Sequence, residues 1–268
     1  MEIFEFEFMQ RAFLAGALVG TACSLIGVFV VLRGLAFIGA GISHSALAGV
    51  AIGLLAGVPP LLASLIFCSL IAVLLGAVSR VGKVREDTAI GIFFAATMAL
   101  GIFLLSFAES RSVDLLSYLF GSILTISYEE LLYSLVLTAV VAGVVYLFYK
   151  ELIAVIFDEE LAQLSGVPAR FISYMLLVLV SIAVIASIKL VGIVLVSALI
   201  VTPAATALQL SRSFNRVVAL SVLLGVLQTE LGLILAYYFD CPPGATIVLL
   251  STTVFLASTA GKAALSRP

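Results

Sequence analysis

The stretch AFIGAGISHSALAGVAIGLLAG, residues 36–57, contains a single ionisable side chain, that of His44. An α-helix needs about 20 predominantly apolar residues to cross the hydrocarbon core of a bilayer, so this stretch is typical of a transmembrane helix. Small residues recur in it at every fourth position: Gly41, Ser45, Gly49, Gly53 and Gly57. Residues four apart share one helix face, and small side chains there let a second helix approach closely. We therefore expect a tightly packed transmembrane helix, with His44 beside its packed face.

The whole chain of 268 residues shares this apolar character. Apolar residues make up 63% of it and charged residues 10%, whereas a soluble domain is roughly half apolar and about a quarter charged. The 13 Lys and Arg residues against 15 Asp and Glu residues leave no basic surface for nucleic-acid phosphates. Composition therefore excludes an ordinary soluble protein and a nucleic-acid binder. It predicts one lipid-embedded domain over residues 1–268.

Hydropathy predicts nine segments of spanning length, at residues 9–32, 36–57, 60–78, 88–107, 129–149, 171–188, 190–209, 217–238 and 245–260. The apolar segment 115–126 is too short to span, and its length is typical of an interfacial or re-entrant helix. Thr202-Pro203 predicts a helix break inside the segment 190–209, because proline frees a backbone carbonyl. The fold class is therefore an all-α integral membrane protein, a single bundle of about eight to nine transmembrane helices.

The distribution of Lys and Arg among the loops predicts the orientation of the chain. Ten of the 13 cations fall on one side of the predicted membrane: Arg33, Arg80, Lys83, Arg85, Lys150, Arg170, Arg212, Arg216, Lys262 and Arg267. Cytoplasmic loops carry such an excess, so we expect these loops and the C-terminus inside and the N-terminus outside. The segment Met1–Phe8 is acidic, so we expect no cleaved signal peptide.

The inside loop 150–170 differs from the others because it contains a short helical pattern. The residues that define this pattern are Asp158, Glu159, Glu160, Leu161, Ala162 and Gly166. The three carboxylates suit the positive end of a helix, and the glycine, with Pro168 after it, stops the helix. We interpret this short cytoplasmic helix as a docking element for a partner; a solvated linker is the alternative.

Two ionisable residues lie deep in the predicted spans, where such groups are costly and are therefore candidates for function. His44 lies nine residues into its span, and Glu230 lies well inside 217–238. His44 is either a ligand for a passing divalent metal ion or a structural histidine bonded across a helix interface. Glu230 is either a metal ligand, a proton-coupling group, or a protonated acid bonded to a neighbouring hydroxyl. Lys189 lies at an outer boundary, from which it can reach water.

No constellation for catalysis is present in the sequence. It contains no GxxxxGK[ST] loop for ATP, and one histidine excludes an HExxH zinc site. Cys23, Cys68 and Cys241 form no CxxC pair, so we expect neither a disulfide nor a cysteine metal cage. We therefore expect a protein that is not an enzyme and holds no permanent cofactor.

Four segments resemble, in order, the permease subunits of zinc/manganese/iron-type ABC importers. They are GVFVVLRGLAFIGAGISHSALAGVAIG (27–53), DLLSYLFGSIL (114–124), VGIVLVSALIVTPAATA (191–207) and YYFDCPPGATIVLL (237–250). The resemblance implies a homodimer in a prokaryotic cell membrane with one translocation path between the two copies. It also implies separate cytoplasmic ATPase subunits, which would dock on the helix near Asp158–Gly166, and an extracytoplasmic metal-binding protein.

The resemblance further implies a metal path that includes His44 and four polar residues: Ser43, Asp114, Ser122 and Asp240. The sequence departs from the family pattern at Ala40 and Ser122, where members usually have Asp. We hypothesise that Glu230 partly replaces this lost charge beside His44.

The transported substrate is expected to be Zn²⁺ or Mn²⁺. Imidazole without a carboxylate favours zinc, whereas carboxylate-rich sites favour manganese. A chelated metal, which needs fewer protein ligands, is an alternative substrate. A proton-coupled secondary transporter using Glu230 and a purely structural membrane subunit are the alternative functions.

Overall fold

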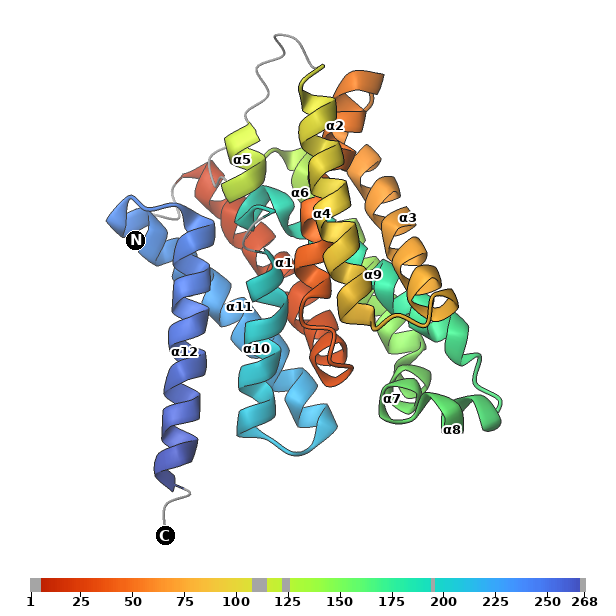
Figure 1. The fold of residues 1–268 in the computed structure, drawn as a ribbon. Helices are drawn as coiled ribbons and strands as arrows, with labels where there is room; N and C mark the ends of the chain where they lie inside the picture. The colour runs from red at the N-terminus through yellow and green to blue at the C-terminus, as the bar shows by residue number, and fades with distance from the viewer. Residues whose placement is uncertain (1–5, 108–114, 122–125, 194–195, 266–268) are drawn as a thin grey trace.

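The computed structural model describes residues 6–107, 115–121, 126–193 and 196–265, and all regular secondary structure within these ranges is helical (Figure 1). The helices are α1 (Glu7–Leu32), α2 (Ile38–Ala56), α3 (Pro60–Val81), α4 (Glu86–Leu105), α5 (Leu115–Phe120), α6 (Tyr128–Leu147), α7 (Tyr149–Phe157), α8 (Glu159–Leu164), α9 (Ala169–Val191), α10 (Val196–Leu210), α11 (Phe214–Phe239) and α12 (Pro243–Leu265).

Eight of these helices are long and apolar enough to cross a membrane: α1, α2, α3, α4, α6, α9, α11 and α12. The remaining predicted span, 190–209, corresponds to α10, which has 15 residues. At 1.5 Å per residue it extends about 22 Å, less than the roughly 30 Å of a hydrocarbon core. The fold class predicted from the sequence is confirmed, with α10 as the short member of the bundle.

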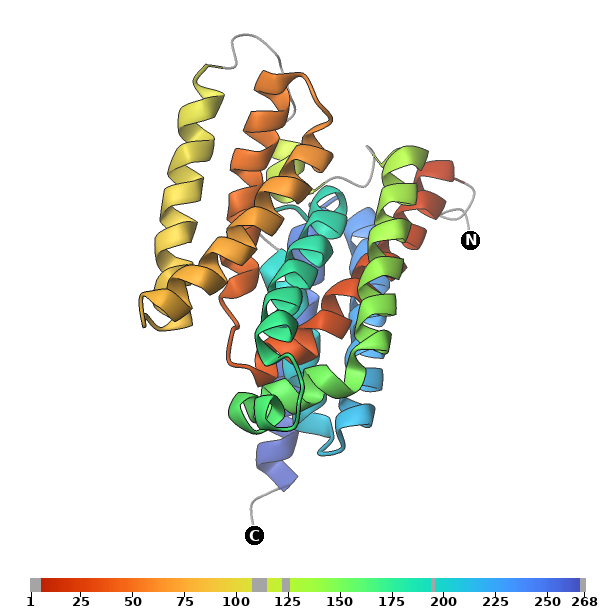
Figure 2. The same cartoon turned by 90° about the vertical axis from the view of Figure 1, so that its right-hand side faces the viewer.

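The three shortest helices lie at opposite ends of the bundle. Successive long helices alternate in direction, and Figures 1 and 2 show α5 at one end and α7 with α8 at the other. We name these ends the α5 end and the α8 end. The first helix begins toward the α5 end, and the last helix finishes at the α8 end.

Small residues bring the central helices together. Gly20 of α1 lies against Gly225 of α11, and Gly232 of α11 lies against Ile247 of α12. Helices in lipid gain little from the hydrophobic effect when they associate, so close packing at small residues supplies much of their attraction. Most residues of α1, α2 and α9 are buried in the bundle, whereas α4, α6 and α12 contain few buried residues.

The predicted break at Thr202-Pro203 is wrong. Pro203 lies inside α10, which continues from Val196 to Leu210. A proline in a helix interior removes one hydrogen bond, which a helix surrounded by neighbours tolerates. The chain instead breaks at Gly192, which ends α9 with φ +86°, a conformation that favours glycine.

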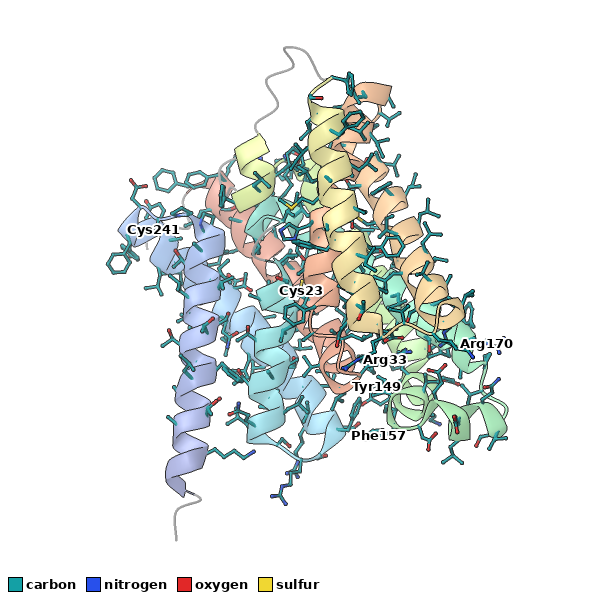
Figure 3. The ribbon with its side chains drawn as sticks, in the orientation of Figure 1. Cys23, Arg33, Tyr149, Phe157, Arg170 and Cys241 are labelled. Atoms are coloured by element: carbon teal, nitrogen blue, oxygen red, sulfur yellow. The ribbon has the colours of Figure 1, made fainter. Side chains whose placement is uncertain are left out.

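The three cysteines are free. Cys23 and Cys68 are buried in the bundle, whereas Cys241 is exposed at the turn between α11 and α12 (Figure 3). The Sγ of Cys23 lies 2.9 Å from the hydroxyl of Ser187, so this thiol joins α1 to α9. Cys23 and Cys68 therefore act as small packed residues, as free cysteines in apolar surroundings usually do.

Candidate metal path and cytoplasmic helix

The stripe of small residues in α2 is a packing surface, as the sequence predicts. Gly41 lies against Ile90 of α4, and Gly49 lies against Ser64 of α3. The hydroxyl of Ser45 lies 2.8 Å from that of Thr97 in α4. The stripe therefore fixes α2 between α3 and α4.

His44 is the one residue between Gly41 and Ala51 that is not buried. Its Nδ1 lies 2.9 Å from the carbonyl oxygen of Ala40, one turn earlier. A carbonyl oxygen only accepts hydrogen bonds, so Nδ1 carries the proton. The lone pair of the neutral ring is then on Nε2, the nitrogen that this contact does not use.

Two neighbours further restrict the imidazole of His44. The Ser43 hydroxyl donates to the same Ala40 carbonyl at 3.1 Å and lies 3.4 Å from Nδ1. The ring of Phe94 in α4 packs with its centroid 4.6 Å from that of His44. The backbone and α4 thus set the tautomer and the position of the ring.

Ala40 contributes its carbonyl to this arrangement but no side-chain ligand. An aspartate at this position would place a carboxylate one turn from the imidazole. Within the described ranges, no group of three or more His, Cys, Asp or Glu side chains is positioned to hold a metal ion. Among the residues that the structure describes, His44 is therefore not part of a complete metal cage within one protomer.

Glu230 lies in a different part of the bundle. Its Oε1 is close to Gly16 of α1 and, among the described residues, has no hydrogen-bond partner. Its helix α11 packs against α1, α10 and α12, whereas α2 packs against α3, α4, α9 and α10. The helix packing within a protomer gives no support for Glu230 beside His44, and that hypothesis stays a prediction.

Gln228 is a candidate that the sequence reasoning missed. It is buried in α11, and both polar atoms of its amide lack a hydrogen-bond partner within the described ranges. The feature of the sequence that could have indicated Gln228 is the run of three polar residues, Gln228, Thr229 and Glu230, inside an apolar helix.

The predicted cytoplasmic helix is α8, and its capping is as the sequence indicates. The Oδ1 of Asp158 accepts a hydrogen bond from the Leu161 amide at 2.9 Å, which caps the helix. Gly166 follows the helix with φ +85°. Ala162 is buried, whereas Glu160 and Leu161 are exposed.

The sequence did not predict α7, which runs from Tyr149 to Phe157 directly before α8. Tyr149 and Phe157 lie at the same end of the bundle as Arg33 (Figure 3). Burial raises the pKa of the Tyr149 phenol above its usual value, so the hydroxyl stays protonated. It donates a hydrogen bond of 2.6 Å to Asn215 at the start of α11.

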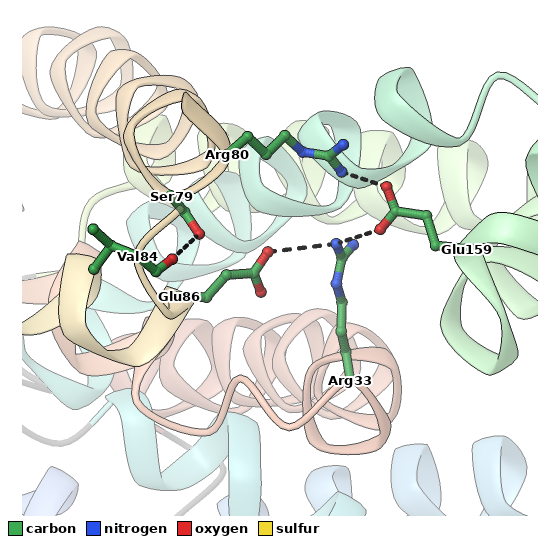
Figure 4. A network of polar contacts seen from close by, with 6 residues as sticks. All are labelled: Arg33, Ser79, Arg80, Val84, Glu86 and Glu159. Carbon is green, nitrogen blue, oxygen red and sulfur yellow. Dashed lines mark hydrogen bonds and ion pairs between the residues drawn. The ribbon is translucent and has the colours of Figure 1, made fainter. Parts of the chain in front are cut away.

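Glu159, the first residue of α8, points toward the membrane helices. Its Oε1 lies 2.6 Å from Arg80 and its Oε2 lies 3.4 Å from Arg33. Arg33 also lies 3.6 Å from Glu86 (Figure 4). We name these four residues the inner ion cluster.

At the α5 end, Asp240 caps the end of α11 in a left-handed conformation and is exposed. The other two residues of the predicted path, Asp114 and Ser122, lie outside the described residues.

Lys189 is paired with Glu130 at 3.1 Å and lies 4.5 Å from the ring centre of Tyr118. Lys189, Glu130 and Tyr118 line a cavity of about 300 Å³ between α3, α5, α6 and α9.

Eight helices of membrane-spanning length among the described residues define a multi-pass membrane protein, and an ionisable imidazole inside the bundle marks a candidate substrate path. The chain belongs to the ABC 3 transport family, whose model matches residues 5–262. It is therefore a multi-pass membrane subunit of a transport system.

Several relatives are similar over almost the whole chain. The manganese transport system membrane protein MntC of Halalkalibacterium halodurans is 37% identical, over 95% of this chain and 87% of that protein. The manganese import system permease protein ScaB of Streptococcus gordonii is 35% identical, over 95% and 91%. A probable iron transport system membrane protein of Haemophilus influenzae is 33% identical, over 97% and 96%.

Solved structures agree with the fold. PsaBC from Streptococcus pneumoniae, in complex with Fab, matches with a TM-score of 0.86 and 33% identity, over 96% of this chain and 92% of that chain. A metal-chelate type ABC transporter in an inward-facing conformation matches with a TM-score of 0.76 and 15% identity, which concerns the fold alone. The resemblance to the permease subunits of metal-ion ABC importers is confirmed.

Proposed function

We propose that two copies of this chain form the path of an ABC importer for a divalent transition metal ion, with His44 as a ligand on the path. The observation that carries the proposal is the orientation of the imidazole. Nδ1 is held by the Ala40 carbonyl, so the Nε2 lone pair is available to a metal ion. Because His44 is partly exposed in the protomer, a second copy can complete the site.

A metal site with few protein ligands is suited to transport. An ion must bind well enough to enter the path and weakly enough to leave it, so several carboxylates around it would retain it. One imidazole from each copy, with water or backbone oxygens, gives a site of moderate affinity. Alternating access would then expose this site first to the α5 end and afterwards to the α8 end.

Mn²⁺ is the ion to test first, because MntC and ScaB, both at least 35% identical, are named for manganese. Zn²⁺ is the second ion, because an imidazole donor without the Asp at position 40 favours zinc. A chelated metal remains a third possibility for a site with so few ligands.

The proposed orientation places the α8 end in the cytoplasm. Arg33, Arg80 and Arg85 lie at the α8 end, where an excess of cations indicates the cytoplasmic side. The ATPase subunits would then dock at α8, and a metal-binding protein would deliver the ion at the α5 end. This places the N-terminus outside and the C-terminus inside.

The test is uptake of Mn²⁺ and, separately, Zn²⁺ by proteoliposomes that contain the chain, its ATPase subunit and its binding protein. We expect H44A to lower ATP-dependent uptake by about 10- to 100-fold, because the ligand is lost. Retention of the ATPase subunit should be unchanged.

The matched control is T97V, which breaks the contact with Ser45 in the same α2–α4 interface and leaves the imidazole in place. If T97V and H44A lower uptake equally, His44 has a packing role and the proposal fails. Uptake without ATP that E230Q abolishes would instead support a proton-coupled transporter.

A further inference from the structure

The exposed and buried sides of α8 have different chemistry. Residues of a helix are 100° apart, so Glu159 and Ala162 lie on one side while Leu161 and Leu164 lie on the opposite side. Ala162 is buried and Glu159 contacts the bundle, whereas Leu161 and Leu164 are 61% and 86% exposed. The side with Leu161 and Leu164, beside which Glu160 is also exposed, is free to contact a partner. The side with Glu159 and Ala162 is already occupied by the protein itself.

The inner ion cluster joins α8 to the ends of three membrane helices. Arg33 caps the end of α1, Arg80 is in the last turn of α3, and Glu86 is in the first turn of α4. Within the described ranges α8 packs against α7 and α9, and its Glu159 carboxylate reaches α1 and α3 directly. Within these ranges it reaches α4 only through Arg33, which also pairs with Glu86. The Arg80 guanidinium also lies 5.7 Å from the ring centre of Tyr174 in α9.

The contacts of the inner ion cluster are partly shielded from water. The side chain of Arg33 is only 13% exposed, and its Nη1 has no hydrogen-bond partner among the described residues. A shielded ion pair is screened less than a surface pair, and removing one partner leaves a poorly solvated charge. Arg33 therefore depends on Glu159 and Glu86 for its neutralisation.

Helix α4 continues from this cluster to the candidate metal path. Glu86 is eight residues before Phe94, so the two are about 12 Å apart along the helix axis. Between them, Ile90 lies against Gly41 of α2, and the Phe94 ring packs on His44. A displacement of α8 that pulls on the cluster would shift α4 against α2.

We propose that Glu159 is a positioning residue that transmits motion of α8 to α1, α3 and α4, and that the ATPase subunit contacts α8 on its opposite, apolar side. This inference rests on the proposed function, because it requires an ATPase subunit at the α8 end. The sequence pattern predicted only a docking element for a partner. This inference instead assigns Glu159 to attachment to the bundle and the side with Leu161 and Leu164 to attachment to the partner.

The experiment measures Mn²⁺ transported per ATP hydrolysed in proteoliposomes of the complete complex, supplied with MnCl₂. We expect E159Q to lower this ratio about ten-fold, within the usual range of coupling between sites. ATP hydrolysis and the amount of ATPase subunit that co-purifies should stay within about two-fold of wild type. A residue that only stabilised the fold would lower the yield of complex rather than this ratio.

The matched control is E151Q. Glu151 is a carboxylate of the neighbouring helix α7, and within the described ranges it forms no ion pair. E151Q should leave the ratio unchanged. R80Q removes the 2.6 Å contact of Glu159 with Arg80 but leaves its contact with Arg33, so it should lower the ratio in the same direction as E159Q and by less. R80Q also tests the inference if E159Q gives little folded complex. The double variant should lose no more than E159Q alone, because E159Q already removes the contact with Arg80.

Two outcomes would overturn the inference. The first is an E159Q complex that assembles and keeps its transport ratio within two-fold of wild type. The second is loss of the ATPase subunit from E159Q, which would place Glu159 in the docking surface. Wild-type complex that assembles but takes up neither Mn²⁺ nor Zn²⁺ would instead contradict the proposed function.

Discussion

The two six-residue helices α5 and α8 lie at opposite ends of the bundle and are attached to it in different ways. At α5 the attachment is backbone against backbone. Gly121 lies against the Leu190 carbonyl, Gly192 lies against the Leu119 carbonyl, and the Ile193 amide donates to the Tyr118 carbonyl at 3.0 Å. At α8 the attachment to α1 and α3 is made by side chains, through the Glu159 carboxylate.

This difference matters for what each helix can do. Backbone contacts at glycines leave no space between the segments, so α5 cannot move without the end of α9. Ion pairs between long side chains keep contact over a range of positions, so α8 can shift while it stays connected. The α5 end is therefore built as a fixed part of the bundle, and the α8 end is built to transmit movement.

The largest effect is expected from G192A. Gly192 has φ +86°, and a Cβ there would overlap the backbone of Leu119 and Phe120. Backbone strain and overpacking together should cost about 3 kcal/mol of stability. Thermal unfolding of the detergent-solubilised protein measures this loss.

Two glycines serve as controls for G192A. Gly166, after α8, has nearly the same φ but open space around its Cβ, so G166A should cost only about 1 kcal/mol. Gly143 is inside α6 and also has open space, so G143A should gain about 0.5–1 kcal/mol from helix propensity. Equal losses from G192A and G166A would show that the close contact at α5 contributes nothing.

A smaller effect is expected from D158A, which removes the N-cap of α8. Loss of a cap costs about 1 kcal/mol. Because α8 contacts the bundle at few points, the loss should be local and appear as faster hydrogen exchange of the amides of 159–164. D158N keeps an oxygen for the cap and should exchange as slowly as wild type; faster exchange across the whole protein would contradict a local role.

The smallest effect is expected from salt. Raising the ionic strength from 0.1 to 1 M shortens the screening length from about 10 Å to about 3 Å. The partly exposed pair of Glu159 and Arg80 should weaken by less than about 1 kcal/mol, and hydrogen exchange in α8 should accelerate accordingly. Exchange in α5, which is attached by backbone contacts, should not change. A larger response at α5 than at α8 would reverse the comparison.

Much of the fold follows from local sequence because its signals act over one or two helix turns. The apolar segments predicted nine spans, of which eight are helices of spanning length among the described residues, and the spacing of small residues predicted the packed face of α2. Asp158 and Gly166 marked the ends of α8 through hydrogen bonding and backbone conformation, which are short-range effects. The break at Pro203 was wrong because neighbouring helices support α10 through the proline.

The candidate site was less predictable because its contacts join distant parts of the chain. His44 was found as the one histidine in an apolar span, but the use of the Ala40 carbonyl by Nδ1 needs side-chain geometry. Glu230 was recognised by its charge, whereas its position against α1 depends on helix packing. Glu159 was assigned to partner docking because carboxylates at a helix start give no information about distant arginines.

The sequence by itself determined that this protein is a multi-helix membrane protein with a capped helix in one loop, because composition, periodicity and capping are local properties of the chain. Only the tertiary structure decided the direction in which that helix presents its charge. Glu159 meets Arg80 and Arg33 across 79 and 126 positions of sequence. Contacts of that range exist only once the membrane helices have packed and brought their ends together.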